Sequence, residues 1–113
     1  MKKIYLFSAL VFLASSLSAQ TEWIKHLDNP VLVPGAAGEW DAGSILGGSV
    51  IFHDDTFRMW YSKGLFAENE KHIGYATSPD GIHWTKSVDN PVLVTGPAGS
   101  WDEGRVIFPT VLM

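Results

Sequence analysis

Two Trp-Asp pairs, Trp40-Asp41 and Trp101-Asp102, contain the side chains of this sequence that are best suited to chemistry. Two carboxyl groups held about 5 to 9 Å apart across a glycosidic bond can cleave that bond. An indole ring can stack on the apolar face of a sugar. Both residue types also have a structural explanation, because an Asp can accept backbone N–H groups in its own turn and a Trp can pack between sheets. The fact that the pair occurs twice favours the structural explanation.

Glu103 and Arg105 follow the second pair, whereas Ala42 and Ser44 occupy the equivalent positions after the first. A symmetric scaffold can acquire a site when charged side chains are present in one copy and absent from the other. Arg can hydrogen-bond sugar hydroxyls or keep a carboxylate ionised, and Glu could act as acid, base or ligand contact. The structural alternative is a pair of solvated charges at the rim of the molecule.

The candidate site therefore combines carboxyl, guanidinium and indole groups. The candidate catalytic residues are Asp41, Asp102 and Glu103, and the candidate substrate-binding residues are Arg105, Trp40 and Trp101. No second His stands at ligand spacing from His72, so the sequence predicts no metal site and no cofactor, and nothing supports a structural calcium ion.

An internal repeat contains both pairs. Residues 23–52 align with residues 84–113 without a gap, and half of the aligned pairs are identical. The core of the match is DNPVLVPGAAGEWDAG from Asp28 against DNPVLVTGPAGSWDEG from Asp89. A period of this length filled with short strand-like runs is typical of a repeat array or a propeller.

Four strand-like runs separated by turn residues lie between the copies, at 49–53, 57–62, 72–77 and 82–86. They predict an all-β fold: one four-stranded antiparallel blade of a β-propeller, with 106–112 beginning the next blade. The connections before the first strand and between the second and third strands then share one end of the sheet. The candidate residues lie at that end, together with Glu68 and Glu70 in the second connection.

The N-terminal segment 1–19 has the layout of a secretory signal peptide, with two lysines, an apolar core and a run of small residues. Its apolar core is too short for a bilayer span, which needs roughly 20 residues. Removal of Lys2 and Lys3 with this segment changes the formal net charge from −4 to −6, which argues against nucleic acid or an anionic membrane as partner. The chain has no cysteine, so it has no disulfide framework. We expect a secreted or periplasmic protein without a membrane anchor after cleavage.

The motifs NPVL, WD, SVIF, RMWYSK and IGYATSPDGIHW together resemble the five-bladed β-propellers of the glycoside hydrolase family 43 and 32 type. The resemblance covers essentially everything after the leader, and it implies that residues 20–113 are the N-terminal part of a five-bladed domain that hydrolyses or binds carbohydrate at its axis. The segment SPDGIHW resembles the Asp-box turns of sialidase-type propellers, which stabilise a turn. We therefore assign Asp80 no chemistry.

The sequence departs from these families at one position. They often carry Asp-Pro just before the first inner strand, where the Asp is the catalytic base, but Gly47-Gly48 stands here and Phe108-Pro109 stands in the second copy. The resemblance places the general acid, a Glu, in a later blade. We expect a secreted glycoside hydrolase acting on an oligo- or polysaccharide substrate, and the alternative is a non-catalytic carbohydrate-binding or scaffold propeller that lost the base.

Overall fold

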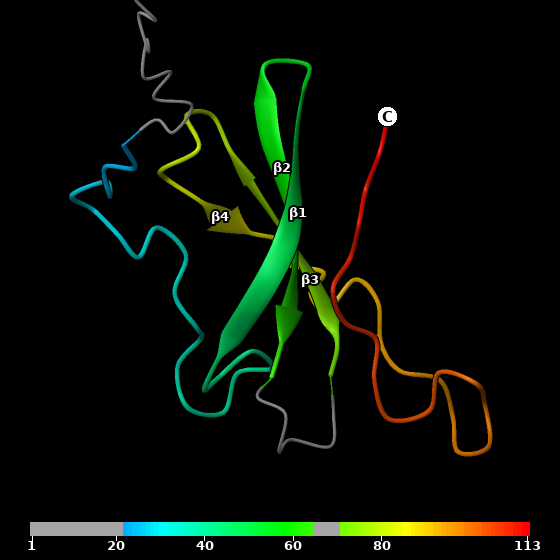
Figure 1. The fold of residues 1–113 in the computed structure, drawn as a ribbon. Coiled ribbons are helices and arrows are strands. Elements are labelled where there is room, and N and C mark those ends of the chain that lie inside the picture. Colours follow the sequence, from blue (N-terminus) through cyan, green and yellow to red (C-terminus); the bar gives the residue numbers. More distant parts are fainter. Residues whose placement is uncertain (1–21, 65–70) are drawn as a thin grey trace, which may run out of the picture.

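The structure is a computed structural model that describes residues 22–64 and 71–113. The leader 1–19 and the two glutamates Glu68 and Glu70 lie outside the described residues. One antiparallel sheet forms the centre of the fold, in the order β1-β2-β3-β4 (Figure 1). Its strands are β1 (Ile45–His53), β2 (Thr56–Lys63), β3 (Ile73–Ser78) and β4 (Thr85–Lys86).

The described residues contain no helix, and hence no helix that could cross a membrane. This confirms the all-β prediction, and the meander of four strands is consistent with one propeller blade.

The β1-β2 hairpin turns through Asp54 and Asp55, whose φ angles are 48° and 53°. Two central residues with positive φ are typical of the tight two-residue hairpin turn, in which Asp is favoured. Strand β1 begins at Ile45, four residues before the expected start at 49. The additional residues pair with β2 across a bulge between Leu46 and Gly48.

Strand β4 has two residues, whereas the sequence predicted 82–86. Residues 78–84 form a side-chain-stabilised turn instead. The outer edge of β3 is nevertheless covered beyond β4. Ser87 N donates to Tyr75 O at 2.9 Å, and the Asn90 amide accepts from Tyr75 N at 2.7 Å and donates to Tyr75 O at 2.9 Å. Further along, Ile73 N donates to Leu93 O at 2.8 Å.

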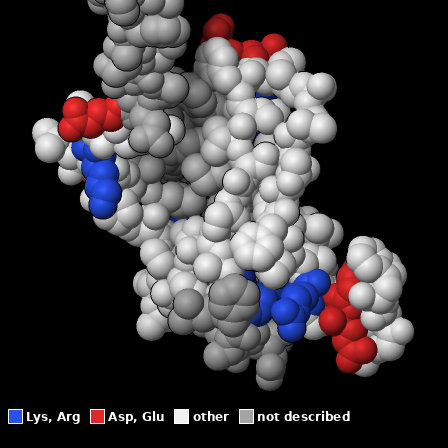
Figure 2. All heavy atoms as spheres, viewed as in Figure 1, with Lys and Arg blue, Asp and Glu red and all other residues white. Residues whose placement is uncertain are grey.

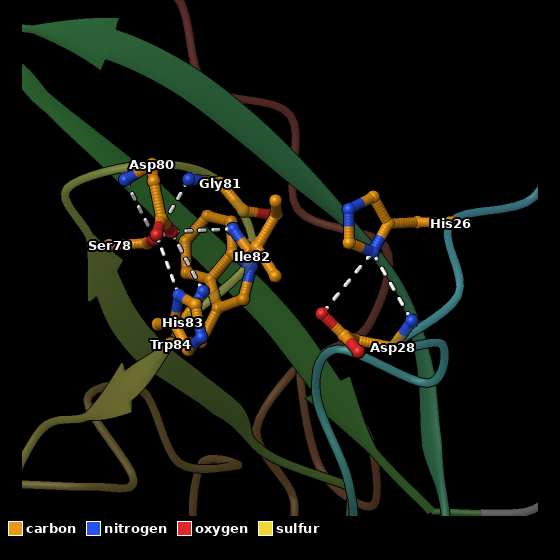
Figure 3. Close-up of polar contacts among 8 residues, drawn as sticks. All are labelled: His26, Asp28, Ser78, Asp80, Gly81, Ile82, His83 and Trp84. Atoms are coloured by element: carbon orange, nitrogen blue, oxygen red, sulfur yellow. Dashed lines mark hydrogen bonds and ion pairs between the residues drawn. The ribbon is translucent and has the colours of Figure 1, made fainter.

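The turn between β3 and β4 is organised around Asp80 (Figure 3). Its Oδ1 accepts the backbone N–H groups of Ile82 and His83, each at 2.8 Å, and its Oδ2 lies 2.6 Å from His83 Nδ1. Trp84 Nε1 closes the turn by donating to Gly81 O at 2.9 Å. Asp80 therefore stabilises the turn, as the motif predicted.

The His83-Asp80 pair makes stability dependent on pH. Hydrogen bonds from His83 and Ile82 hold the pKa of Asp80 well below its ordinary value of 3.8, and the Asp80 carboxylate raises the pKa of His83 above 6.5, with a smaller contribution from Asp28. The His83 contribution is complete below pH 6.5 and is lost as pH rises through the raised pKa. The Asp80 contribution is present above pH 3.8 and is lost as pH falls through the lowered pKa.

We therefore expect His83→Gln to lower the melting temperature most at about pH 5.5 and to have little effect at about pH 9. Melting curves of both proteins across this range measure the difference. A difference that is constant with pH would contradict the assignment.

Residues 106–112 lie against one face of the sheet, as expected for a neighbouring blade, but they do not form the predicted strand. Phe108 N donates to Ser62 Oγ at 2.9 Å and Val111 N donates to Ser49 Oγ at 3.1 Å. These bonds join backbone to side chains across the face of β1 and β2. A strand requires backbone bonds to a neighbouring strand, and among the described residues no strand pairs with this segment.

Candidate functional site

The two copies of the repeat form loops of the same shape. Isolated bridges join Gly35 to Ala42 and Gly96 to Glu103, which are equivalent positions in the two loops 35–42 and 96–103. Within each loop the backbone N–H of the fifth residue donates to the carbonyl of the second, at 3.0 Å in both copies. The repeat seen in the sequence is thus a repeat of backbone conformation.

Trp40 and Asp41 lie in the first loop, and Trp101, Asp102 and Glu103 lie in the second. The first loop (cyan) and the second (orange) lie on opposite sides of the lower part of the sheet in Figure 1. The structure therefore separates the candidate residues into two groups.

Asp41 is 1% exposed, and its carboxylate joins two strands. Oδ2 accepts a hydrogen bond from Tyr61 Oη at 3.2 Å and one from Lys86 Nζ at 2.6 Å. The Lys86 side chain is 27% exposed, so this is a largely buried ion pair between the first loop and β4. Buried charges need such partners, and this geometry supports the structural explanation of the Asp. Its partners, however, are side chains of the sheet, whereas the sequence suggested N–H groups of its own turn.

Tyr61 connects this ion pair to the rest of the sheet. Burial, followed by the charge of Asp41 and the hydrogen bond to it, raises the pKa of the Tyr61 hydroxyl above its ordinary value of 10.0. The hydroxyl therefore stays protonated at neutral pH and donates to Asp41. Asn90 Nδ2 lies 3.4 Å from the same hydroxyl and also bonds Tyr75 O. One polar network thus links the first loop, β2, β3, β4 and the segment after β4.

Trp40 packs onto the sheet beside this network. Its ring centroid lies 5.8 Å from that of Tyr61. Gly74 gives the indole room, because a Cβ at this position would lie 2.6 Å from Trp40 Cη2 and from Tyr61 Cζ. Trp40 thus packs onto the sheet at this contact, and the residue is half-buried.

A pocket of about 280 Å³ opens between the first loop and the segment that follows β4. It combines an indole wall with two carboxylates, an ammonium group, a hydroxyl and an amide. Its lining residues are Glu39, Trp40, Asp41, Lys86, Ser87, Val88 and Asn90. Aromatic walls with a few polar groups are typical of small-ligand pockets, although this one is open on one side and its Asp is already ion-paired.

The second-loop candidates lie apart from this pocket. Trp101 is 96% exposed, Glu103 and Arg105 are exposed and Asp102 is partly exposed. Figure 2 shows acidic side chains over this loop, with basic side chains beside them at the lower end of the sheet. Glu103 Oε2 accepts Gly99 N at 2.6 Å, so its carboxylate also stabilises its own loop.

In the first loop the carboxylate of Glu39 bonds a different backbone group, because its Oε2 accepts Ala36 N at 2.9 Å. It aligns with Ser100 in the repeat and not with Glu103. The two loops therefore use carboxylates from different positions for the same purpose. The presence of Glu103 in the second copy alone, which suggested a site, is therefore partly explained by its bond within the loop.

Sequence reasoning missed Lys86 and Asn90 as members of the site. A signal was present, because Lys25 aligns with Lys86 and Asn29 with Asn90, so both are repeated like the Trp-Asp pair. Both bonds form only in the folded sheet, since Lys86 lies 45 residues along the chain from Asp41 and Asn90 lies 29 residues from Tyr61.

Gly47 and Gly48, which replace the carboxylate of the resembled families, differ in their surroundings. A Cβ at Gly48 would overlap the carbonyl oxygen of Trp60, so the bulge requires glycine there. A Cβ at Gly47 would meet no atom within 4 Å. In the second copy Phe108 has a φ of 56°, which is an unusual conformation for a bulky residue.

Among residues 22–64 and 71–113, no group of three or more His, Asp or Glu side chains is placed to hold a metal ion.

Comparison with curated proteins found similarity to two enzymes of Thermoanaerobacter sp. (strain X514). The chain is 35% identical over 77 residues to a 1,2-beta-oligomannan phosphorylase, covering 62% of this chain and 26% of that protein. It is 34% identical over 84 residues to a beta-1,2-mannobiose phosphorylase, covering 63% of this chain and 28% of that protein.

The chain therefore spans about a quarter of the length of these relatives. No protein-family model matches it, and no solved structure matches it. Both relatives act on bonds between sugars, which agrees with the expected carbohydrate chemistry. Neither is named as a hydrolase, so the comparisons give no specific support to families 43 and 32.

Proposed function

We propose that the protein is a carbohydrate-active enzyme that cleaves glycosidic bonds. The observation that carries this proposal is the similarity to two enzymes of β-1,2-mannoside metabolism, which covers more than half of this chain. The all-β blade supports it, because propellers can present loops from several blades around one axis. By this similarity the first substrates to test are β-1,2-linked mannosides.

The preferred reaction is hydrolysis by a secreted enzyme. The predicted signal peptide supports water as acceptor, because a charged sugar phosphate made outside the cell would not cross a membrane unaided. The second candidate is phosphorolysis, which the names of the two relatives favour.

The products distinguish the two reactions. The purified protein is incubated with β-1,2-mannobiose, with and without inorganic phosphate. Free mannose alone in both reactions indicates hydrolysis, and phosphate-dependent mannose 1-phosphate indicates phosphorolysis. A panel of chromogenic glycosides extends the test to other sugars. Binding of the disaccharide without any product would favour the non-catalytic propeller, the alternative suggested by Gly47-Gly48.

Among the candidate residues, we propose that Glu103 and Arg105 contact the substrate. They are exposed in and beside the second loop, whereas the Asp41 carboxylate is already bonded to Lys86 and Tyr61. Asp102 and Trp101 remain candidates of the same loop.

Glu103→Gln and Arg105→Ala are each expected to lower kcat/KM by about tenfold, which corresponds to ~1.4 kcal/mol of transition-state stabilisation. Glutamine keeps an oxygen that can accept the bond from Gly99 N, so the loop should retain its shape while the negative charge is lost. The measurement combines steady-state kinetics with a melting curve for each variant.

Asp89→Asn is the matched control for Glu103→Gln. Asp89 is an exposed carboxylate in the second repeat, and its replacement by Asn removes the same negative charge. Unchanged turnover in both test variants would contradict the proposed substrate contacts, whether or not the enzyme cleaves mannosides.

A further inference from the structure

The pocket beside Trp40 is separate from the residues proposed to contact the substrate. It opens between the first loop and the segment after β4, and its volume is about 280 Å³. The second loop, which carries Glu103, lies on the opposite side of the lower part of the sheet (Figure 1). The proposed activity therefore leaves this pocket without a role.

The aromatic wall of the pocket is held in place by the sheet. The ring of Trp40 lies 5.8 Å from the ring of Tyr61, and Gly74 leaves space for the indole because it has no side chain. Tyr61 and Gly74 belong to β2 and β3, so the indole is positioned before any ligand arrives. A preformed wall lowers the entropic cost of binding, and an indole can stack on the apolar face of a sugar.

The polar groups of the pocket include both acceptors and donors. Within the described part of the chain, Glu39 bonds the backbone through Oε2, which leaves Oε1 as an acceptor. Lys86 Nζ donates to Asp41 at 2.6 Å, and an ammonium group has further N–H donors. A sugar hydroxyl both donates and accepts, so it can bridge a carboxylate and an ammonium group.

The charge and the size of the pocket select its ligand. The carboxylates of Glu39 and Asp41 and the ammonium group of Lys86 give the lining a formal charge of −1. A Cβ at Gly35 would overlap an oxygen of each carboxylate, so the loop holds the two groups close together. They repel an anion but accept hydrogen bonds from neutral hydroxyl groups. The volume lies just below the roughly 300 to 1,000 Å³ that drug-sized ligands need, so it suits a single sugar unit.

We propose that this pocket is a second carbohydrate-binding site, which holds one neutral pyranose unit apart from Glu103 and Arg105. The indole of Trp40 stacks on the sugar ring, Glu39 accepts its hydroxyl groups and Lys86 donates to them. The pocket thereby anchors a glycan to the protein without taking part in the reaction. The site rests on the lining of the pocket, and only the choice of a mannoside as first probe rests on the proposed function.

NMR spectra of the isotope-labelled protein test the site through its indole N–H signals. The variants Trp40→Phe and Trp101→Phe identify the two signals that matter. Methyl β-D-mannopyranoside is expected to shift the signal of Trp40 and to leave that of Trp101 in place. No shift with this glycoside or with methyl β-D-glucopyranoside would overturn the proposal, and so would a shift of Trp101 alone. Inorganic phosphate should leave the Trp40 signal in place, and a shift with phosphate would identify an anion site instead.

Glu39→Gln tests the polar contact. It is expected to raise the Kd for the glycoside about fivefold, because a neutral acceptor replaces a charged one. Glutamine keeps an oxygen that can accept Ala36 N, so the loop should keep its shape, which a melting curve checks. Asp89→Asn is the matched control, because Asp89 lies between Val88 and Asn90 but does not line the pocket. It should leave the Kd unchanged, and an unchanged Kd in Glu39→Gln as well would contradict the contact.

Cleavage of β-1,2-mannobiose, measured separately, distinguishes this inference from the proposed activity. Cleavage without a shift of the Trp40 signal by either glycoside would overturn the second site alone. A shift of the Trp40 signal without cleavage would support the second site and contradict the proposed activity.

Discussion

Asp41→Asn is expected to lower the free energy of unfolding by about 2 to 3 kcal/mol, with a smaller effect on turnover. The amide keeps one acceptor oxygen but directs N–H groups toward the ammonium of Lys86, which lies 2.6 Å from the carboxylate. The Lys86 side chain is only 27% exposed, so water replaces the lost carboxylate only in part. Urea unfolding followed by tryptophan fluorescence measures the loss.

A double-mutant cycle with Lys86→Met isolates the ion pair. Lys86→Met leaves the Asp41 carboxylate, whose side chain is 2% exposed, with Tyr61 as its remaining donor among the contacts described. We expect this variant to lose at least as much stability as Asp41→Asn, and the double variant to lose less than the sum. Additive losses would show that the pair contributes no coupling. Lost turnover at unchanged stability in Asp41→Asn would identify Asp41 as catalytic.

Gly74→Ala is expected to lower the free energy of unfolding by about 2 to 3 kcal/mol. The new methyl group would lie 2.6 Å from Trp40 Cη2 and from Tyr61 Cζ, which is too close for carbon atoms. The Tyr61 ring cannot move freely, because its hydroxyl also donates to Asp41. The expected result is a displaced indole together with a weaker ion pair, measured as reduced stability in urea.

Two variants control for the clash at Gly74. Gly47→Ala adds the same methyl group to β1, where it would meet no atom within 4 Å, and should change stability little. In a Trp40→Leu background the smaller side chain gives way, so Gly74→Ala should then be less costly than in the native protein. An equal cost in both backgrounds would show that the indole does not limit the space at Gly74.

The sequence was sufficient to predict the sheet because its strands are marked by local chemistry. Alternating side chains, the Asp54-Asp55 turn and the Asp80-Gly81 turn define three of the four strands to within a few residues. The bounds differ from the prediction at two places, for two different reasons. Pairing across the bulge at Gly48 extends β1 toward Ile45, and the bonds of Asp80 convert most of the expected fourth strand into a turn.

The candidate site could be predicted only in part. The repeat favoured a structural role for Trp40 and Asp41, and both residues contact the sheet. The partners of Asp41 come from β2 and β4, and no local pattern specifies which lysine approaches it. The presence of Glu103 in only one copy suggested a site. Its carboxylate accepts Gly99 N in its own loop, so part of its role is structural. Sequence alignment of the copies cannot show that Glu39 performs this same task from another position.

The covering of β3 also affects how the protein behaves toward its own copies. An open strand edge is a template for another chain and can lead to aggregation. After β4 ends, the Asn90 amide binds both backbone groups of Tyr75, and Leu93 accepts the N–H of Ile73. Asn90 therefore blocks this edge and keeps a neighbouring molecule from adding a strand to it.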